Sequence, residues 1–269
     1  MKQKIGFLFM IYDSIAHEET WNNFFKDVDP EKYVVLIHYK IQNSLKYFEG
    51  AKLKHCIPTE YGDISLVNAQ NLLLTEALKD PAVYKMVLLS DTCIPLKSFN
   101  YVYDTLTKDN NGYFNECPKS QSFPRCEPVT KYIPRDEIYK SGQWFIANRT
   151  HASEYTTHDE YIKAFTVPYF DKDSSIHAEE HYYITINKKF CGTDDTVFTP
   201  NTAETATTFA NWQGMDYKYP STRGIKNYSS VTKEKMEYLI SSPCLFGRKF
   251  LPYCRVDGIR MDKFLSNLI

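Results

Sequence analysis

The feature that most limits the fold is the spacing of two short apolar segments near the start of the chain. Ile5–Tyr12 and Tyr33–Tyr39 each have the length of a buried strand, and Glu18–Lys26 between them carries three large aromatic side chains. A strand, a helix and a second strand within about 35 residues form a βαβ unit. Such a unit joins two parallel strands by a right-handed crossover. We therefore expect an α/β protein with a mostly parallel, Rossmann-like sheet flanked by helices.

The remaining segments continue this alternation. Further strands are expected at Lys54–Ile57, Tyr84–Leu89, Gly142–Ala147, Thr207–Trp212 and Cys244–Phe250, and helices at Asn68–Leu78, Phe99–Leu106, His151–Phe165, Glu179–Lys188 and Thr232–Ile240. Residues 107–135 contain four prolines and little periodicity, which predicts an irregular lid or binding loop, or else a disordered segment. Because the 269 residues show no repeat and no linker, we expect a single domain over 1–269.

Composition narrows the classes of function. A net charge of −1 argues against general nucleic-acid binding, and no apolar run approaches the roughly 18 residues of a membrane span. The first residues resemble a signal peptide but lack a small-residue cleavage site. Seven cysteines without a CxxC pair favour a reduced, cytoplasmic protein, although one or two disulfides stay open. A Golgi-type location would require an N-terminal anchor that has been removed.

One polar cluster directly follows an expected buried strand. Ser90, Asp91 and Thr92 come after the apolar run that ends at Leu89, and Pro95 follows. In open α/β sheets, ligands bind beyond the carboxyl ends of the strands. Asp91 is therefore a candidate for binding a hydroxyl-rich ligand. The alternative is a carboxylate that only caps a turn or the next helix.

Two further clusters carry charge next to apolar segments. Glu179 and Glu180 are adjacent, so on a helix they point about 100° apart and at most one faces squarely into a cleft. One of them is a candidate general base, whereas two acids in a first helical turn also suit the helix dipole. Arg248 and Lys249 stand between apolar neighbours. They suit a diphosphate or, alternatively, a solvated strand edge.

These segments, taken in order from residue 4 to about 250, resemble the core-2/I-branching glycosyltransferases, glycosyltransferase family 14, and most of all their plant branch. The similar blocks are Lys4–Tyr12 with His17-Glu18 and Trp21, Tyr61–Ala69, Val87–Leu96 with Phe99, Ser141-Gly-Gln-Trp-Phe145 with Asn148-Arg149, Glu179-Glu180-His181-Tyr182 with Thr185, and Cys244–Phe250. Any single block is weak. The ordered set is specific.

The resemblance implies a GT-A-type fold and an inverting transfer from a UDP-sugar to a glycan hydroxyl, with no metal and no further cofactor. It places the nucleotide-binding half at about 1–106 and the acceptor and catalytic half at about 107–269. The family's catalytic base falls on Glu180. The residues expected near the donor are Arg223, Lys249, Arg248, Tyr39, Gln70 and Asp91, and those expected near the other substrate groups are Trp212, Trp144 and Glu179. Of these, Lys249 and Arg223 match the diphosphate-binding cations, and Trp212 matches an acceptor-site aromatic residue.

Two positions depart from the family pattern, and the donor sugar stays open. Glu179 replaces the usual Asp before the base, and Gln70 stands where many relatives carry an acidic residue. Relatives use UDP-N-acetylglucosamine, UDP-xylose or UDP-glucuronate, and the first two are favoured here.

The residues also indicate whether a divalent metal ion is expected and which two alternative functions remain. The D-x-D pattern that holds a divalent ion in many GT-A enzymes occurs at Asp27-Val-Asp29 and at Asp171-Lys-Asp173. Neither follows a buried strand, so we expect no metal site. One rival is a catalytically inactive module of the same fold that binds glycans or nucleotides. The other is a glycoside hydrolase that pairs Asp91 with Glu179 or Glu180.

Overall fold

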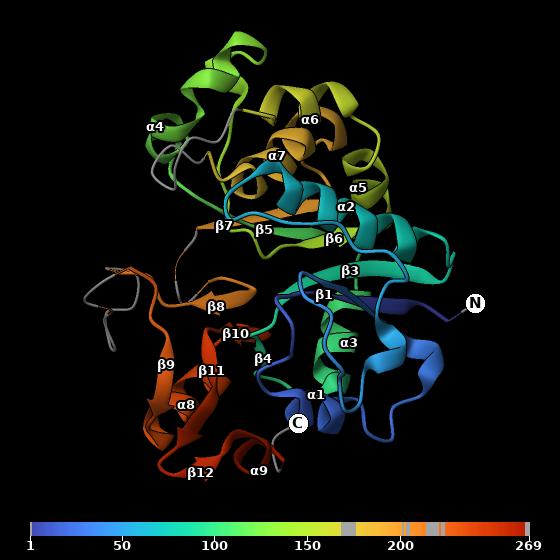
Figure 1. Ribbon diagram of the computed structural model, residues 1–269, viewed down its shortest axis with the longest axis vertical. Helices are drawn as coiled ribbons and strands as arrows, with labels where there is room; N and C mark the ends of the chain where they lie inside the picture. The colour runs from blue at the N-terminus through green and yellow to red at the C-terminus, as the bar shows by residue number, and fades with distance from the viewer. Residues whose placement is uncertain are drawn as a thin grey trace.

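A six-stranded sheet forms the centre of the protein (Figure 1). The structure, a computed structural model, describes residues 2–167, 176–200, 202, 205–213, 221 and 224–266. In spatial order the strands are β2 (Tyr33–Tyr39), β1 (Lys4–Ile11), β3 (Val83–Ser90), β6 (Ile146–Asn148), β5 (Gly112–Glu116) and β7 (Thr196–Pro200). Only β6 runs antiparallel to its neighbours in this sheet, whereas β1 is parallel to β2 and β3, and β5 to β7. The predicted α/β class with a mostly parallel sheet is confirmed.

The apolar runs of the central strands arise because both faces of the sheet are covered. In β1, Phe7 and Phe9 point into one core, and Leu8 points into the other. In β3, Leu88 and Leu89 divide in the same way. Strands buried on both faces have near-continuous apolar sequences rather than alternating ones. This explains why the sequence identified these strands.

Helices cover the two faces of the sheet (Figure 1). One face carries α1 (Glu18–Phe25) and α3 (Phe99–Thr107), and the other carries α2 (Ile64–Leu78), α5 (Arg149–Tyr155), α6 (Asp159–Phe165) and α7 (Ala178–Ile186), with the short α4 (Phe123–Cys126) beyond its edge. The α2 helix begins four residues before its predicted start because the Asp63 carboxylate accepts the N–H of Ser65 and caps it.

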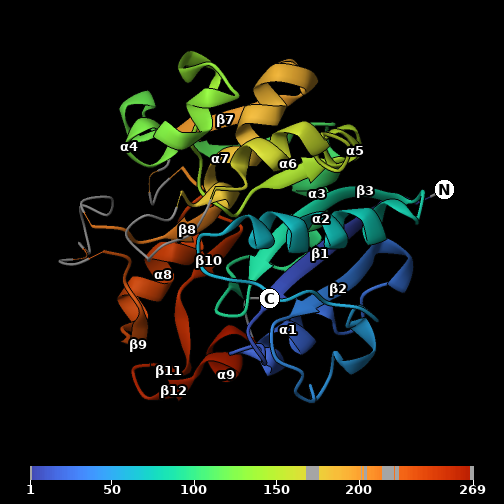
Figure 2. The same cartoon turned by 45° about the horizontal axis from the view of Figure 1, so that its top comes forward.

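Two small sheets lie beside the carboxyl ends of β1 and β3 (Figures 1 and 2). The first contains β4 (Ile94–Pro95), β10 (Phe246–Arg248) and β8 (Thr208–Ala210), and the second contains β12 (Ile259–Arg260), β11 (Phe250–Val256) and β9 (Tyr228–Val231). They enclose a third core with α8 (Lys233–Ser241) and α9 (Met261–Leu265). The N–H of Phe250 donates to the carbonyl of Thr92 at 3.1 Å. This contact fixes β10 and β11 next to the end of β3.

Three predictions of secondary structure are wrong, and the strand predicted at Gly142–Ala147 begins only at Ile146, as β6. Lys54–Ile57 forms no strand. It runs beside β2 with side-chain contacts, such as the N–H of Ile57 donating to His38 Nε2 at 3.1 Å. Residues 107–135 are not one irregular segment, because they contain β5 and short helices that bury Val129 in the core. The single helix at His151–Phe165 is two helices, α5 and α6.

No helix in the described part of the chain has both the length and the apolar character needed to cross a membrane.

Candidate active site

A cavity of about 320 Å³ opens beyond the carboxyl ends of β1, β2 and β3, and we call it the Lys249 cavity. Its walls carry three cations and three acids, namely Lys40, Arg248, Lys249, Glu60, Asp91 and Glu179. This is the edge of the sheet at which α/β proteins bind their ligands. The structure thus brings four of the predicted charged residues to one cavity at the predicted edge.

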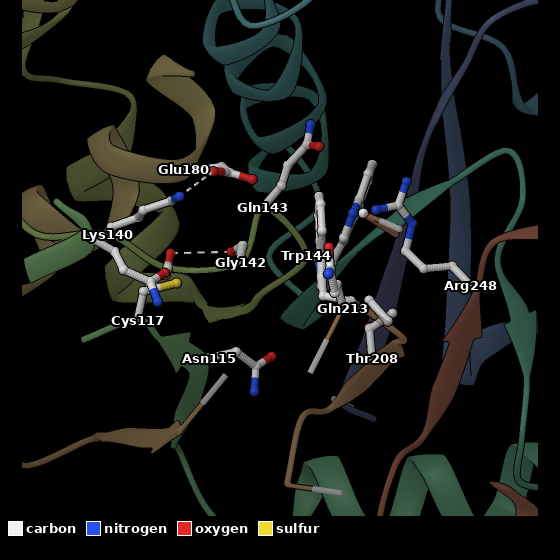
Figure 3. Close-up of a pocket in the computed structure, with 15 residues that line it drawn as sticks. Asn115, Cys117, Lys140, Gly142, Gln143, Trp144, Glu180, Thr208, Gln213 and Arg248 are labelled. Atoms are coloured by element: carbon white, nitrogen blue, oxygen red, sulfur yellow. Dashed lines mark hydrogen bonds and ion pairs between the residues drawn. The ribbon is translucent and has the colours of Figure 1, made fainter. Parts of the chain in front are cut away.

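A second cavity of about 340 Å³ adjoins the first, and we call it the Glu180 cavity (Figure 3). It lies between α7, the segment before β6, and β8. Gln143, Trp144 and Arg248 line both cavities and form the wall between them. Trp212 lines the Glu180 cavity and keeps 37% of its surface exposed. The two cavities are therefore neighbours that share one wall.

The first turn of α7 divides its two carboxylates between these cavities. Glu180 lines the Glu180 cavity, and Glu179 lines the Lys249 cavity. Their separation follows from the 100° turn between adjacent helical positions. The backbone around them is fixed, because the N–H of Glu180 donates to the carbonyl of His177 at 2.9 Å and its carbonyl accepts from the N–H of Ser141 at 2.8 Å.

The side chain of Glu180 is paired with a lysine. Lys140 Nζ lies 3.3 Å from Glu180 Oε2, and each side chain is 21% exposed. Figure 3 shows the pair on the cavity wall, with Gln143 beside the carboxylate. Glu180 is thus a partly buried carboxylate that faces open space and has a cation at one oxygen.

Arg248 forms the centre of the shared wall. Its guanidinium carbon lies 4.5 Å from the centre of a Trp144 ring, and its Nε donates to Ser90 Oγ at 3.3 Å. Figure 3 shows the Arg248 and Trp144 side chains next to each other. Burial lowers the pKa of Arg248, although the nearby Cys93 and Asp91 oppose this shift. A guanidinium stacked on an indole is oriented before any ligand arrives.

Lys249 and Asp91 complete a charged group of three with Arg248. Burial, and then the like charge of Arg248, lowers the pKa of Lys249, whereas Asp91 acts in the opposite direction. Burial raises the pKa of Asp91, and both cations oppose that shift. Two cations thus share one carboxylate in a poorly solvated place. A bound anion would offset their desolvation.

Two predicted donor residues, Tyr39 and Gln70, line neither cavity, and a third lies outside the described residues. Tyr39 faces away, because alternation along β2 puts His38 on the cavity side and turns the Tyr39 ring to the opposite core. Gln70 is fully buried on α2 and lines neither cavity. Arg223 lies outside the described residues.

Among the cavity residues that the sequence did not predict are Lys140, His38 and Tyr61. Lys140 lies directly before the Ser141–Phe145 block, so its position next to a matched motif was the available signal. His38 is one residue from Tyr39, and the period-two rule applied to β2 would have found it. Tyr61 is 60% exposed at the Lys249 cavity, and its ring makes an edge contact with His177, with 5.2 Å between the ring centres.

Fold and cavities together define an α/β protein whose ligand site lies at the carboxyl edge of a mostly parallel sheet. The family model of the Core-2/I-branching enzyme matches residues 5–240. The chain therefore belongs to the Core-2/I-branching enzyme family, and by family it is a glycosyltransferase. The resemblance seen in the sequence is confirmed.

The proteins that are similar to this chain include one curated relative and two solved structures. Glycosyltransferase BC10 of Oryza sativa subsp. japonica is 25% identical, with 96% of this chain and 75% of BC10 aligned. A crystal structure of the galactosyltransferase LgtC with donor and acceptor sugar analogs superposes with a TM-score of 0.43 and 10% identity, over 90% of this chain and 86% of that one. A glycosyltransferase involved in glycosylation of the major capsid of PBCV-1 gives a TM-score of 0.43 and 8% identity, over 91% and 93%.

Proposed function

We propose that the protein is an inverting, metal-independent glycosyltransferase of GT-A type that moves a sugar from a UDP-sugar to a hydroxyl of a glycan, forming a β linkage. UDP would occupy the Lys249 cavity, and the acceptor would occupy the Glu180 cavity. N-acetylglucosamine and xylose are the donor sugars that the family resemblance favours.

One observation carries the proposal. The wall of Gln143, Trp144 and Arg248 has the Glu180 carboxylate on one side. On the other side Lys249 lies near Arg248, and these two cations share one nearby carboxylate, Asp91. An inverting transfer needs a base for the acceptor hydroxyl and a positive environment for the departing diphosphate, and it needs them on opposite sides of the reacting carbon. The two cavities supply this division.

The chemical step follows from these positions. Glu180 takes the proton of the acceptor hydroxyl while that oxygen attacks C1 of the sugar from the face opposite UDP. The bond between C1 and the diphosphate oxygen breaks, and its electron pair leaves with UDP. General-base help of this kind contributes about 10²–10⁴-fold. Arg248 and Lys249 stabilise the charge that develops on the leaving diphosphate, an electrostatic contribution that is often larger.

Metal independence is part of the proposal because Arg248 and Lys249 would supply the positive charge that a metal ion supplies in other enzymes. The described residues contain no group of three His, Cys, Asp or Glu side chains arranged to hold a metal. Asp29 caps the turn before β2 and pairs with Lys2 at 2.7 Å, at the amino end of the strand and thus away from the cavities. Asp171 and Asp173 lie outside the described residues. Turnover that is unchanged in excess EDTA would support the proposal, and turnover that stops until Mn²⁺ or Mg²⁺ is returned would contradict it.

The decisive experiment replaces the proposed base. Glu180→Gln should keep UDP binding, measured by calorimetry, and should lose sugar transfer by at least about 10²-fold, measured as UDP released in the presence of acceptor. Normal turnover in the variant would contradict the assignment of Glu180. The main alternative is a catalytically inactive module that binds glycans or nucleotides. It predicts UDP binding without UDP release in the parent protein as well.

A further inference from the structure

Glu179 differs from its neighbour Glu180 because Glu179 has no role in the proposed reaction. Its side chain is only 4% exposed, and it lines the Lys249 cavity. Its Oε1 lies 3.6 Å from His177 Nδ1, whereas its Oε2 has no hydrogen-bond partner among the described residues. A buried carboxyl oxygen without a partner is costly, so native proteins seldom keep one unless a ligand or water supplies the missing contact.

A second unpartnered polar atom belongs to the same cavity. Trp144 is 8% exposed and lines the cavity, and within the described part of the chain its indole N–H has no acceptor. An indole nitrogen can only donate, and an ionised carboxylate can only accept. Together with Glu179 it offers complementary partners to a sugar hydroxyl, which can both accept and donate.

Both groups lie at the sugar end of the cavity under the proposed function. The far end is formed by the ends of β1 and β2, with Tyr12 and His38 in its wall, and Arg248 and Lys249 provide the cations for the diphosphate. The transferred carbon must be within reach of Glu180, so the sugar lies against the shared wall. Glu179 is adjacent to Glu180 in α7, and Trp144 is part of that wall.

The charge of the cavity limits which sugar fits there. Its described lining holds three cations (Lys40, Arg248, Lys249) and three acids (Glu60, Asp91, Glu179). A UDP-sugar adds two negative charges from its diphosphate, so the occupied cavity already has an excess of negative charge. A uronic acid would add one more carboxylate beside Glu179, and like charges in a poorly solvated site repel strongly.

We propose that Glu179 hydrogen-bonds a hydroxyl of the donor sugar and makes the enzyme select uncharged sugars over uronic acids. This inference rests on the proposed function, and it adds a specificity residue to it. Trp144 supports the same sugar by donating its indole N–H.

The test compares the binding of four ligands to the parent protein and to Glu179→Gln by calorimetry: UDP, UDP-xylose, UDP-N-acetylglucosamine and UDP-glucuronate. In the parent, UDP-glucuronate should bind at least about 10-fold more weakly than the better of the two neutral UDP-sugars. In Glu179→Gln this preference should fall by about 10-fold, because the variant loses both the repulsion of the uronic acid and the charged hydrogen-bond acceptor for the neutral sugar. The affinity for UDP should change by less than about twofold.

Two variants separate specificity from charge and folding. Glu60→Gln removes one acid from the same cavity, and it should change the affinities for UDP and all UDP-sugars by the same factor. Glu179→Asp keeps the charge on a shorter side chain. It should therefore still exclude UDP-glucuronate, but it should bind the neutral UDP-sugars more weakly. It also serves as the readout if Glu179→Gln folds poorly, as judged by its thermal unfolding.

The outcomes distinguish the two levels of the proposal. If UDP binds but the preference for neutral sugars is absent, or is unchanged in Glu179→Gln, the role of Glu179 is wrong and the proposed function stands. If neither UDP nor any UDP-sugar binds the parent protein, both are wrong.

Discussion

Lys140 Nζ lies 3.3 Å from Glu180 Oε2, and the two side chains are buried to the same extent on the wall of the Glu180 cavity. The lysine precedes β6 and the glutamate is in the first turn of α7, so the pair connects two elements that are distant in sequence. The lysine thereby orients one oxygen of the carboxylate, Oε2. Under the proposed function, Oε1 is then the oxygen that takes the proton of the acceptor hydroxyl. Lys140 acts as a positioning residue for the proposed base.

Removing this lysine should slow the reaction without weakening the binding of the nucleotide. For Lys140→Met we expect kcat to fall by about 10-fold, because the carboxylate loses the charged contact that holds it. The affinity for UDP, measured by calorimetry, should be unchanged, and Lys140→Arg should recover most of the rate. The matched control is Lys188→Met. Lys188 forms a similarly buried pair with the somewhat more exposed Glu116, at 2.9 Å, and lines neither cavity. Equal loss of rate in both variants would show a general structural effect instead.

Lys249 should govern the affinity for the diphosphate. Replacing it by Met should weaken UDP binding by about 10- to 100-fold, the range for a lost hydrogen bond between charged groups. Lys40→Met is the comparison within the same cavity, because Lys40 is paired with the exposed Glu60 at 3.3 Å. We expect it to change UDP affinity by less than about threefold. UDP affinity that falls equally in both variants would mean that Lys249 supplies only general charge.

The parts of the fold that the sequence predicted are those with a strong local pattern. β1, β2 and β3 are central strands whose apolar runs arise from burial on both faces. β5 and β7 were missed because they are short and mix polar with apolar residues, and their pairing joins residues more than 80 positions apart. Such strands are specified by their neighbours rather than by their own sequence.

The site residues show the same difference between local patterns and contacts with distant parts of the chain. The sequence predicted Asp91, Arg248 and Lys249 because each of these charged residues directly adjoins an apolar segment. Such a pattern can be recognised without knowledge of the fold. Lys140 was missed because its role depends on a contact with α7, 40 residues further on. Tyr39 was misplaced by one position, and in a strand one position exchanges the two faces of the sheet.

Gly112 should be irreplaceable in β5 for a reason of space. A Cβ added there would lie 2.7 Å from His151 Cε1 and 3.0 Å from the carbonyl oxygen of Ile146. His151 is fully buried and its Nε2 lies 3.1 Å from Asp195 Oδ1, so it cannot move freely. Gly112→Ala should therefore lower the free energy of unfolding by about 1–3 kcal/mol. Gly50→Ala, with no atom within 4 Å of the added Cβ, should stay within about 1 kcal/mol in the same urea titration. Equal stability of both variants would contradict the packing argument.

The stability of the protein should fall as the pH drops from about 6.5 to about 4, in part because of His181. This ring is fully buried, its Nδ1 donates to the carbonyl of His177 at 3.0 Å, and its Nε2 has no partner among the described residues. Burial lowers the pKa of His181 from 6.5 to about 4. The unfolded chain therefore binds a proton in this window that the folded chain does not, and protonation favours unfolding. A shift of this size corresponds to up to about 3 kcal/mol.

Urea unfolding at several pH values between 7.5 and 4.5 measures this effect. His181→Gln, whose amide can still donate to the carbonyl, should flatten the dependence of the unfolding free energy on pH by up to one proton. The exposed His55 provides the control, because His55→Gln should leave the slope as it is in the parent. Burial raises the pKa of Glu179, which gives a slope of the opposite sign, so the comparison between variants decides the matter rather than the parent curve. If His181→Gln and the parent lose stability in parallel, the buried imidazole does not cause the acid sensitivity.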